Sequence, residues 1–145
     1  MAKVTRVHDG DTVTLSIDGR SVRARLIGID APEMGQEPWG KMSRTYLKGL
    51  IREIKGRVFI ETDIVPYDKY DRLLVYLWTP DRRNMLNERM IRDGYAVLFT
   101  LQPNSRYAGR FVQALESAKK SGAGIWGPEG LKELPRDYKK AHPRK

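Results

Sequence analysis

Four acidic side chains stand at two turns of the sequence, and carboxylates gathered in this way could hold a divalent cation. Asp9 and Asp11 flank a glycine before one alternating segment, and Asp30 and Glu33 follow the next segment. If the two segments form an antiparallel hairpin, Asp11 and Asp30 are expected to lie close together. Carboxylates at close range repel unless a positive charge intervenes, and oxygen ligands suit calcium or magnesium. Ordinary turn residues that only bond the backbone would explain the same spacing.

Two arginines could add phosphate chemistry to these carboxylates. Arg25 precedes Asp30 on the second segment, and Arg72 follows a charged loop at the start of an apolar run. A guanidinium offers paired donors that match phosphate oxygens, and it stays protonated. A metal, two arginines and a carboxylate would suit phosphoryl transfer, in which negative charge develops on the phosphate. The alternatives are a structural ion pair for Arg25 and a plain surface charge for Arg72.

The composition excludes several other classes of site. The 145 residues fit about one domain, and 40% hydrophobic residues can form a core. The absence of cysteine excludes disulfides and thiol nucleophiles, and two histidines exclude histidine-rich zinc sites. The net charge of +9 favours a polyanionic partner such as nucleic acid. No apolar run is long enough for a membrane span, and the first residues carry no signal-peptide pattern.

The elements that must position these residues are mostly strands in the first half of the chain. Residues 12–17 alternate strictly between polar and apolar, and Asp18-Gly19 favours a two-residue hairpin turn. Apolar patterning predicts strands at 2–7, 12–17, 21–29, 57–62 and 73–78, and helices at about 39–55, 86–93 and 104–121. Five strands with about three packed helices favour an α+β protein built on a five-stranded OB-fold barrel. The expected domain is 1–127, followed by a loosely ordered basic C-terminal tail at 128–145.

Three strings of residues, in order, resemble the thermonuclease family, whose members are similar to staphylococcal or micrococcal nuclease. The strings are VHDGDT at 7–12, RLIGIDAPE at 25–33 and DKYDR at 68–72, and further matches at 86–87, 94–96 and 124–126 extend the resemblance over about 3–127. The resemblance implies an OB-fold, calcium-dependent, sugar-non-specific endonuclease. Such a hydrolase cleaves DNA and RNA phosphodiesters and leaves 3′-phosphate products.

The resemblance also implies roles for individual residues around the metal. Asp11 and Asp30 would be carboxylate ligands of calcium, and the backbone carbonyl of Ala31 would be a third ligand. Asp9 would stand behind these ligands as a neighbouring acid. This chain has Ala31 where the best-known member has threonine, a mild change because the backbone oxygen is the expected ligand.

The remaining roles concern the reaction and the substrate. Glu33 would orient or deprotonate the attacking water, and Arg25 and Arg72 would clamp the phosphate. The expected nucleic-acid contacts are Lys69, Tyr70 and Phe99. Phe99 lacks the hydroxyl of the family's stacking tyrosine, Leu101 has no ring, and the loop at 34–39 is short, so substrate affinity is expected to differ from the family's.

A different class of function remains open, a non-catalytic OB-fold module that binds nucleic acid. Degenerate relatives of that kind lose acids or arginines of the site, whereas this chain keeps the whole set, which favours the nuclease. We expect DNA and RNA substrates, a monomer with no obligate protein partner, and no membrane association. The resemblance favours a secreted or periplasmic location.

Overall fold

The computed structural model describes residues 1–143, and these contain a closed five-stranded barrel. The strands follow one another around the barrel in the order β1 (Ala2–Asp9), β2 (Thr12–Ile17), β3 (Arg20–Leu26), β6 (Leu73–Trp78) and β5 (Arg57–Glu61). β3 and β6 are parallel, and the other neighbouring pairs are antiparallel. The barrel predicted from the sequence is confirmed.

The alternation in β2 and β3 determines which side chains enter the barrel. Val13 and Leu15 of β2 and Ala24 and Leu26 of β3 are at most 1% exposed, while the residues between them face outward. The turn that joins these strands has positive φ at Asp18 and Gly19, as a two-residue hairpin turn requires. The same alternation places Arg25 on the outer face.

The prediction of a single strand at 21–29 is wrong, because the strand is interrupted before Gly28, where the chain changes direction. Gly28 has φ of +84°, and an added Cβ would lie 2.3 Å from the Phe111 ring. After this break β4 (Gly28–Asp30) leaves the barrel and pairs with β7 (Val97–Phe99), a strand that the sequence did not indicate. Ile29 of β4 is fully buried, whereas Arg25 of β3 faces outward. As a result of this interruption, Asp30 lies on β4 and not on the barrel strand β3.

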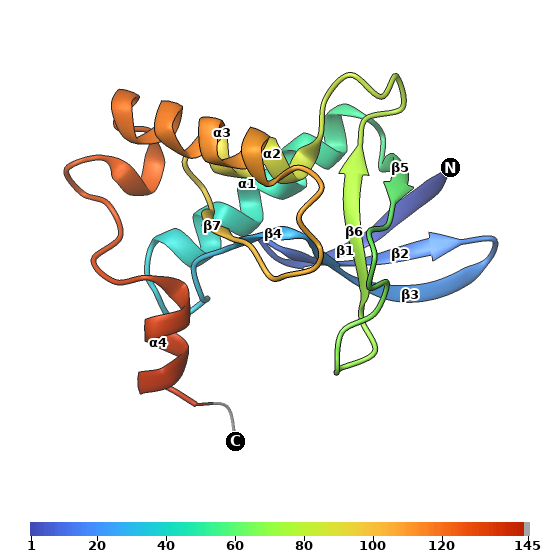
Figure 1. The fold of residues 1–145 in the computed structure, drawn as a ribbon, viewed down its shortest axis with the longest axis horizontal. Coiled ribbons are helices and arrows are strands. Elements are labelled where there is room, and N and C mark those ends of the chain that lie inside the picture. Colours follow the sequence, from blue (N-terminus) through green and yellow to red (C-terminus); the bar gives the residue numbers. More distant parts are fainter. Residues whose placement is uncertain (144–145) are drawn as a thin grey trace.

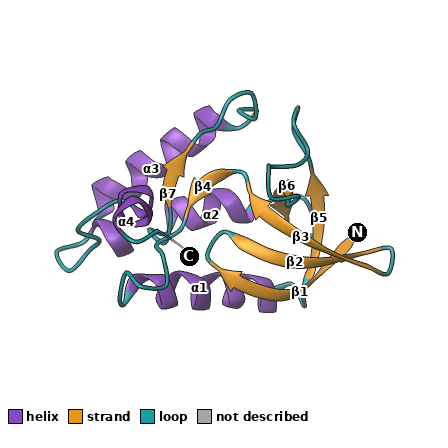
Figure 2. Cartoon of the chain, turned by 90° about the horizontal axis from the view of Figure 1, so that it is seen from below, coloured by secondary structure: helices purple, strands orange, loops and turns teal. Residues whose placement is uncertain are grey.

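The helices gather mainly on one side of the barrel (Figures 1 and 2). They are α1 (Trp39–Glu53), α2 (Leu86–Arg92), α3 (Ala108–Ser121) and α4 (Pro135–Ala141), with a short 3-10 turn η1 (Gly124–Trp126). The first three correspond to the predicted helices, although α3 begins later than expected. The helix α1 packs directly against β1, and α2 and α3 pack on the small sheet of β4 and β7. Among the described residues, no helix is long and apolar enough to cross a membrane.

The segment after residue 127 carries the short helix α4 and touches the loop before α1. Trp39 Nε1 donates to the carbonyl of Glu129 at 3.1 Å, and Gln36 Nε2 donates to the carbonyl of Glu133 at 2.9 Å. The sequence predicted a loosely ordered tail here, and the division into a domain and a tail stays a prediction. Residues 144–145 of that tail lie outside the described part of the chain.

Candidate active site

Arg25 joins the two aspartates that stand at opposite turns of the sequence. Its Nη1 lies 3.0 Å from Asp11 Oδ2, and its Nη2 lies 3.4 Å from Asp30 Oδ1. The hairpin β2–β3 places Asp11 at the start of β2, and the break at Gly28 directs Asp30 back toward it. The guanidinium therefore contacts both carboxylates at once.

Asp11 is held in place by the backbone on the far side of the break. The N–H of Ala31 donates to Asp11 Oδ2 at 2.7 Å, and the Thr12 hydroxyl donates to Asp11 Oδ1 at 2.9 Å. Burial opposes ionisation of this carboxyl, but Arg25 and these hydrogen bonds hold its pKa below the usual value. Asp11 is therefore ionised at neutral pH, and these hydrogen bonds fix the orientation of its carboxylate.

The other two aspartates are shifted in the opposite direction. Burial and the adjacent charge of Asp11 raise the pKa of Asp9 to about 7, although its Oδ1 accepts the N–H of Asp11 at 3.0 Å. Burial also raises the pKa of Asp30, and it outweighs the nearby positive charges of Lys139 and Arg25. The three acids share one region of concentrated negative charge, which a bound cation would relieve.

Glu33 lies in a tight turn, which two hydrogen bonds to Gln36 close. Its N–H donates to Gln36 Oε1 at 2.9 Å, and its carbonyl accepts the N–H of Gln36 at 2.8 Å. An added Cβ at Gly40 would lie 2.2 Å from that carbonyl, so glycine allows α1 to start against the turn. The Glu33 side chain is 15% exposed, and its Oε2 lies 3.8 Å from Lys139 Nζ.

Arg72 is positioned by the charged loop that precedes β6. Asp68 Oδ2 accepts from Arg72 Nε at 2.8 Å, and Asp68 Oδ1 accepts the backbone N–H groups of Tyr70 and Arg72. The Arg72 guanidinium also lies 5.4 Å from the centre of the Tyr70 ring. These contacts hold Nε of Arg72, whose side chain also lines a cavity.

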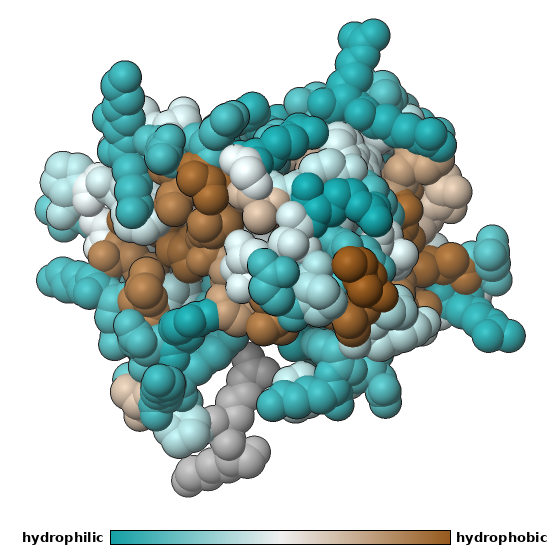
Figure 3. Space-filling view, viewed as in Figure 1, coloured by the Kyte–Doolittle hydropathy of each residue, from teal (hydrophilic) through white to brown (hydrophobic). Residues whose placement is uncertain are grey.

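A cavity of about 580 Å³ brings the two arginines together with the predicted nucleic-acid contacts. Its lining includes Arg25, Lys69, Tyr70, Arg72, Phe99 and Lys139. Asn104 closes one wall, since its side-chain amide bonds both the N–H and the carbonyl of Val65. On the face drawn in Figure 3, hydrophilic surface surrounds separate apolar patches. An exposed Tyr70 and an exposed Leu101 give the cavity rim its apolar character.

α4 places two basic side chains at this site that the sequence did not assign to it. Lys139 Nζ lies 3.5 Å from Asp30 Oδ1, and the Arg136 guanidinium lies 4.2 Å from the centre of the Phe99 ring. The phenol oxygen of Tyr138 lies against Gly35, where an added Cβ would come within 2.0 Å of it. The sequence showed a basic segment, but no local pattern tied it to acids about a hundred residues earlier.

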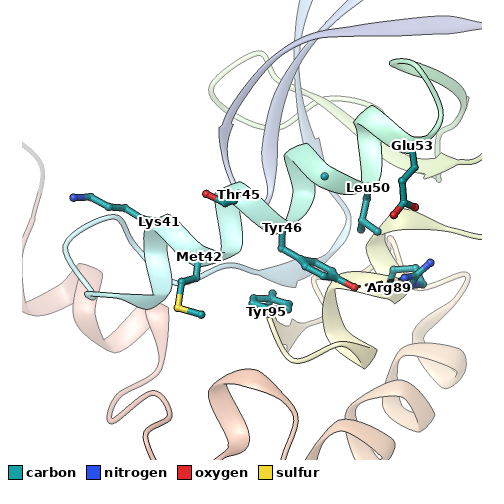
Figure 4. A pocket seen from close by; sticks show the side chains of 9 residues that line it. Lys41, Met42, Thr45, Tyr46, Leu50, Glu53, Arg89 and Tyr95 are labelled. Carbon is teal, nitrogen blue, oxygen red and sulfur yellow. Dashed lines mark hydrogen bonds between the residues drawn. The ribbon is translucent and has the colours of Figure 1, made fainter.

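A separate hollow lies along α1, and it contains none of the predicted site residues (Figure 4). Tyr46 and Tyr95 stack in it with ring centres 4.1 Å apart, and the Tyr46 hydroxyl bonds Asp93 and meets Arg89. The Tyr46 hydroxyl is thus engaged with charged neighbours. Both predicted phosphate-binding arginines line the other cavity, and Asp11 and Asp30 adjoin it through their contacts with Arg25.

The part of this site around Asp11 and Asp30 fits a hard cation that takes most of its coordination sphere from other ligands. Among residues 1–143, no group of three or more acidic or histidine side chains is arranged to hold a metal. Two carboxylates are nevertheless adjacent, and calcium also takes backbone carbonyls and waters as ligands. The Ala31 N–H bonds Asp11, and its carbonyl as a ligand stays a prediction.

Comparison with known proteins agrees with the resemblance found in the sequence. Residues 23–128 match the family model described as "Staphylococcal nuclease homologue". The chain is similar to a thermonuclease of Staphylococcus intermedius, with 37% identity over 128 residues, 85% of this chain and 74% of that protein. A thermonuclease of Staphylococcus hyicus is 35% identical over 129 residues, 86% of this chain and 74% of its own.

A more distant relative carries a related description. The probable endonuclease LCL3 of Pyricularia oryzae is 27% identical over 137 residues, which is 88% of this chain and 52% of that protein. The family model covers more than half of the chain, from within β3 to just beyond η1, and the matches to the two thermonucleases cover most of both chains. This chain therefore belongs to the staphylococcal nuclease homologue family.

Proposed function

We propose that this protein is a calcium-dependent nuclease that hydrolyses phosphodiester bonds of DNA and RNA to 3′-phosphate products. The observation that carries the proposal is the placement of Arg25, which pairs with Asp11 and Asp30 and also lines the cavity that contains Arg72. A carboxylate pair that suits a cation thus borders a cavity that suits a phosphate. Membership of a family with thermonucleases supports the same reaction class.

In this proposal Asp11 and Asp30 would hold the calcium, with the carbonyl of Ala31, and Asp9 would stand behind them. Bound calcium would supply positive charge that lowers the barrier to attack on a polyanion. The fixed hydrogen bonds of Asp11 support this role, because they keep the carboxylate ionised and oriented before binding.

Glu33 would orient the attacking water or accept its proton, and the two arginines would bind the phosphate oxygens. A guanidinium can neutralise charge that develops in the transition state without losing its proton. Arg72 would also stabilise the leaving oxygen, and its attachment to Asp68 would keep the guanidinium in place during the reaction. Lys69, Tyr70 and Phe99 would contact the flanking nucleotide, where an aromatic face can stack on a base.

A digestion assay on single-stranded DNA tests this function. The intact protein is incubated with excess calcium and then with chelator, beside Glu33→Gln. Glu116→Gln, an exposed change on α3, is the matched control. We expect calcium-dependent cleavage by the intact protein and the control, with loss in chelator and in Glu33→Gln. Folded protein that binds DNA without cleaving it in any divalent metal would instead establish a non-catalytic OB-fold binding module.

A further inference from the structure

Two exposed arginines lie on the outer face of the sheet that β1, β2 and β3 form. Arg6 of β1 pairs in register with Thr14 of β2, and Thr14 pairs with Arg23 of β3, so the two arginines stand in one row across the sheet. Both arginines are exposed. Arg44 of α1 joins them, since its Nε donates to the carbonyl of Val7 at 3.3 Å.

The positive charges of these three arginines converge on His8. The His8 Nε2 lies 2.7 Å from the Thr14 hydroxyl, in the middle of the row. Burial and the charges of Arg23, Arg6 and Arg44 lower the pKa of His8, which indicates that all three guanidiniums act on it. Within the described chain none of the three forms an ion pair, whereas Arg89 and Arg110 do.

This basic row continues into the candidate active site. Arg23 and Arg25 alternate with the buried Ala24, so both point outward from β3. Two residues along a strand span about 7 Å, and two strand spacings across the sheet span about 10 Å. The arginines thus follow one another from Arg25 to Arg23 along β3, and from Arg23 across β2 to Arg6 on β1. The helix α1, which carries Arg44, lies beside β1 (Figure 2).

We propose that Arg6, Arg23 and Arg44 form a second binding surface, the barrel-face track, for backbone phosphates of a nucleic-acid strand that extends beyond the phosphate held at Arg25. The inference rests on the proposed function, because it takes the strand at Arg25 as its starting point. A guanidinium can bind a phosphate through two parallel hydrogen bonds. An arginine that forms no ion pair within the protein does not have to break one in order to bind a phosphate. The track makes the protein prefer substrates long enough to reach it.

Binding of labelled oligonucleotides to protein with the Glu33→Gln change tests the track without cleavage. The track variant is Arg6→Gln with Arg23→Gln, which leaves Arg25 untouched. The matched control is Arg52→Gln with Arg83→Gln, which removes the same charge from two exposed arginines outside β1, β2 and β3. Fluorescence anisotropy with a 3-nucleotide and a 15-nucleotide single strand, across a salt series, gives the affinities.

We expect the track variant to bind the 15-nucleotide strand about tenfold more weakly at low salt and to lose about 1.4 from its salt slope. Binding of the 3-nucleotide strand and both affinities of the control are expected to stay unchanged. Equal losses in the control would show that net charge alone acts. Equal losses for both lengths would place the effect in the cavity, and no loss would remove the track.

A membrane surface is the other polyanion that an arginine patch could meet. Loss of binding to anionic phospholipid vesicles, with unchanged oligonucleotide binding, would overturn the nucleic-acid track. The binding assay is independent of catalysis, so its outcome separates from that of the proposed function. Protein that cuts DNA but binds both lengths equally in every variant would refute the track and leave the nuclease intact.

Discussion

The ammonium group of Lys139 lies 3.5 Å from Oδ1 of Asp30, across 109 positions of the chain. The same group lies 3.8 Å from Oε2 of Glu33. A lysine from α4 therefore holds the position in which a cation would neutralise Asp30. Calcium that binds Asp30 must share this carboxylate with Lys139 or displace it.

Replacing Lys139 by methionine is expected to strengthen calcium binding. The Lys139 side chain is 44% exposed, and solvent screening limits such a pair to about 1 kcal/mol or less, which corresponds to at most about fivefold in affinity. Calorimetric titration of calcium into metal-free protein measures it without any substrate. Lys140→Met removes the same charge one residue later on α4 and is the control. Weaker calcium binding in Lys139→Met would contradict the expectation.

A second prediction concerns the loop that presents Arg72. Asp68→Asn keeps the size of the side chain but weakens the charged bond to Arg72 Nε, so the guanidinium loses its fixed direction. We expect kcat to fall more than KM rises, with the larger loss, about 10²-fold or more, in Arg72→Gln. Steady-state cleavage of a short oligonucleotide measures both. Asp71→Asn in the same exposed loop is the control, and an equal loss there would refute a specific role for Asp68.

Local patterning predicted the barrel because its strands carry their own signals. The alternation of β2 and the Asp18-Gly19 turn fix the hairpin, and the hairpin places Asp11 beside Arg25, which also meets Asp30. These are short-range features, and the residues that produce them lie within about twenty positions of one another.

The features that could not be predicted from the sequence depend on contacts between distant segments. β7 is three residues long and gains its order by pairing with β4, and the Phe111 ring, far along the chain, packs so closely on Gly28 that no side chain fits there. Lys139 reaches the acids because Gln36 and Trp39 bond carbonyls of the segment before α4. Periodicity along one segment carries no information about such partners.

The stability of the loop after β5 is expected to depend on the charge of Asp63. Its Oδ2 accepts from the buried Tyr76 hydroxyl at 2.6 Å and from the Arg106 N–H at 3.1 Å. Burial opposes ionisation, but these bonds hold the pKa of Asp63 below its usual value. A lowered folded-state pKa gives stability above the unfolded pKa, near 4, which disappears as the pH falls through the folded value.

Asp63→Asn should therefore lower the free energy of unfolding by about 1–2 kcal/mol at pH 7, and by progressively less below about pH 4. Urea unfolding at pH 7 and at a series of acidic values measures the difference. Asp18→Asn, at the exposed hairpin turn, should change stability little at any of these values. A difference between wild type and Asp63→Asn that stays constant with pH would show that charge plays no part.

The buried amide of Asn87 ties the strand break to the barrel. Its Oδ1 accepts the N–H of Leu77 at 2.9 Å, and its Nδ2 donates to the carbonyls of Ile27 and Val75 at 2.9 and 3.0 Å. Asn87 is fully buried, so water cannot replace these bonds. Asn87→Ala would leave one donor and two acceptors without this partner in the interior.

Leaving buried polar groups unpaired costs about 1–3 kcal/mol each, so Asn87→Ala is expected to lower the free energy of unfolding by about 3 kcal/mol or more. Asn84→Ala, an exposed change in the loop before α2, is expected to cost far less. Urea unfolding followed by circular dichroism measures both variants. Since Ile27 adjoins Gly28, the loss should be accompanied by faster hydrogen exchange at β4, which carries Asp30. A loss below about 1 kcal/mol would mean that the neighbouring backbone finds other partners.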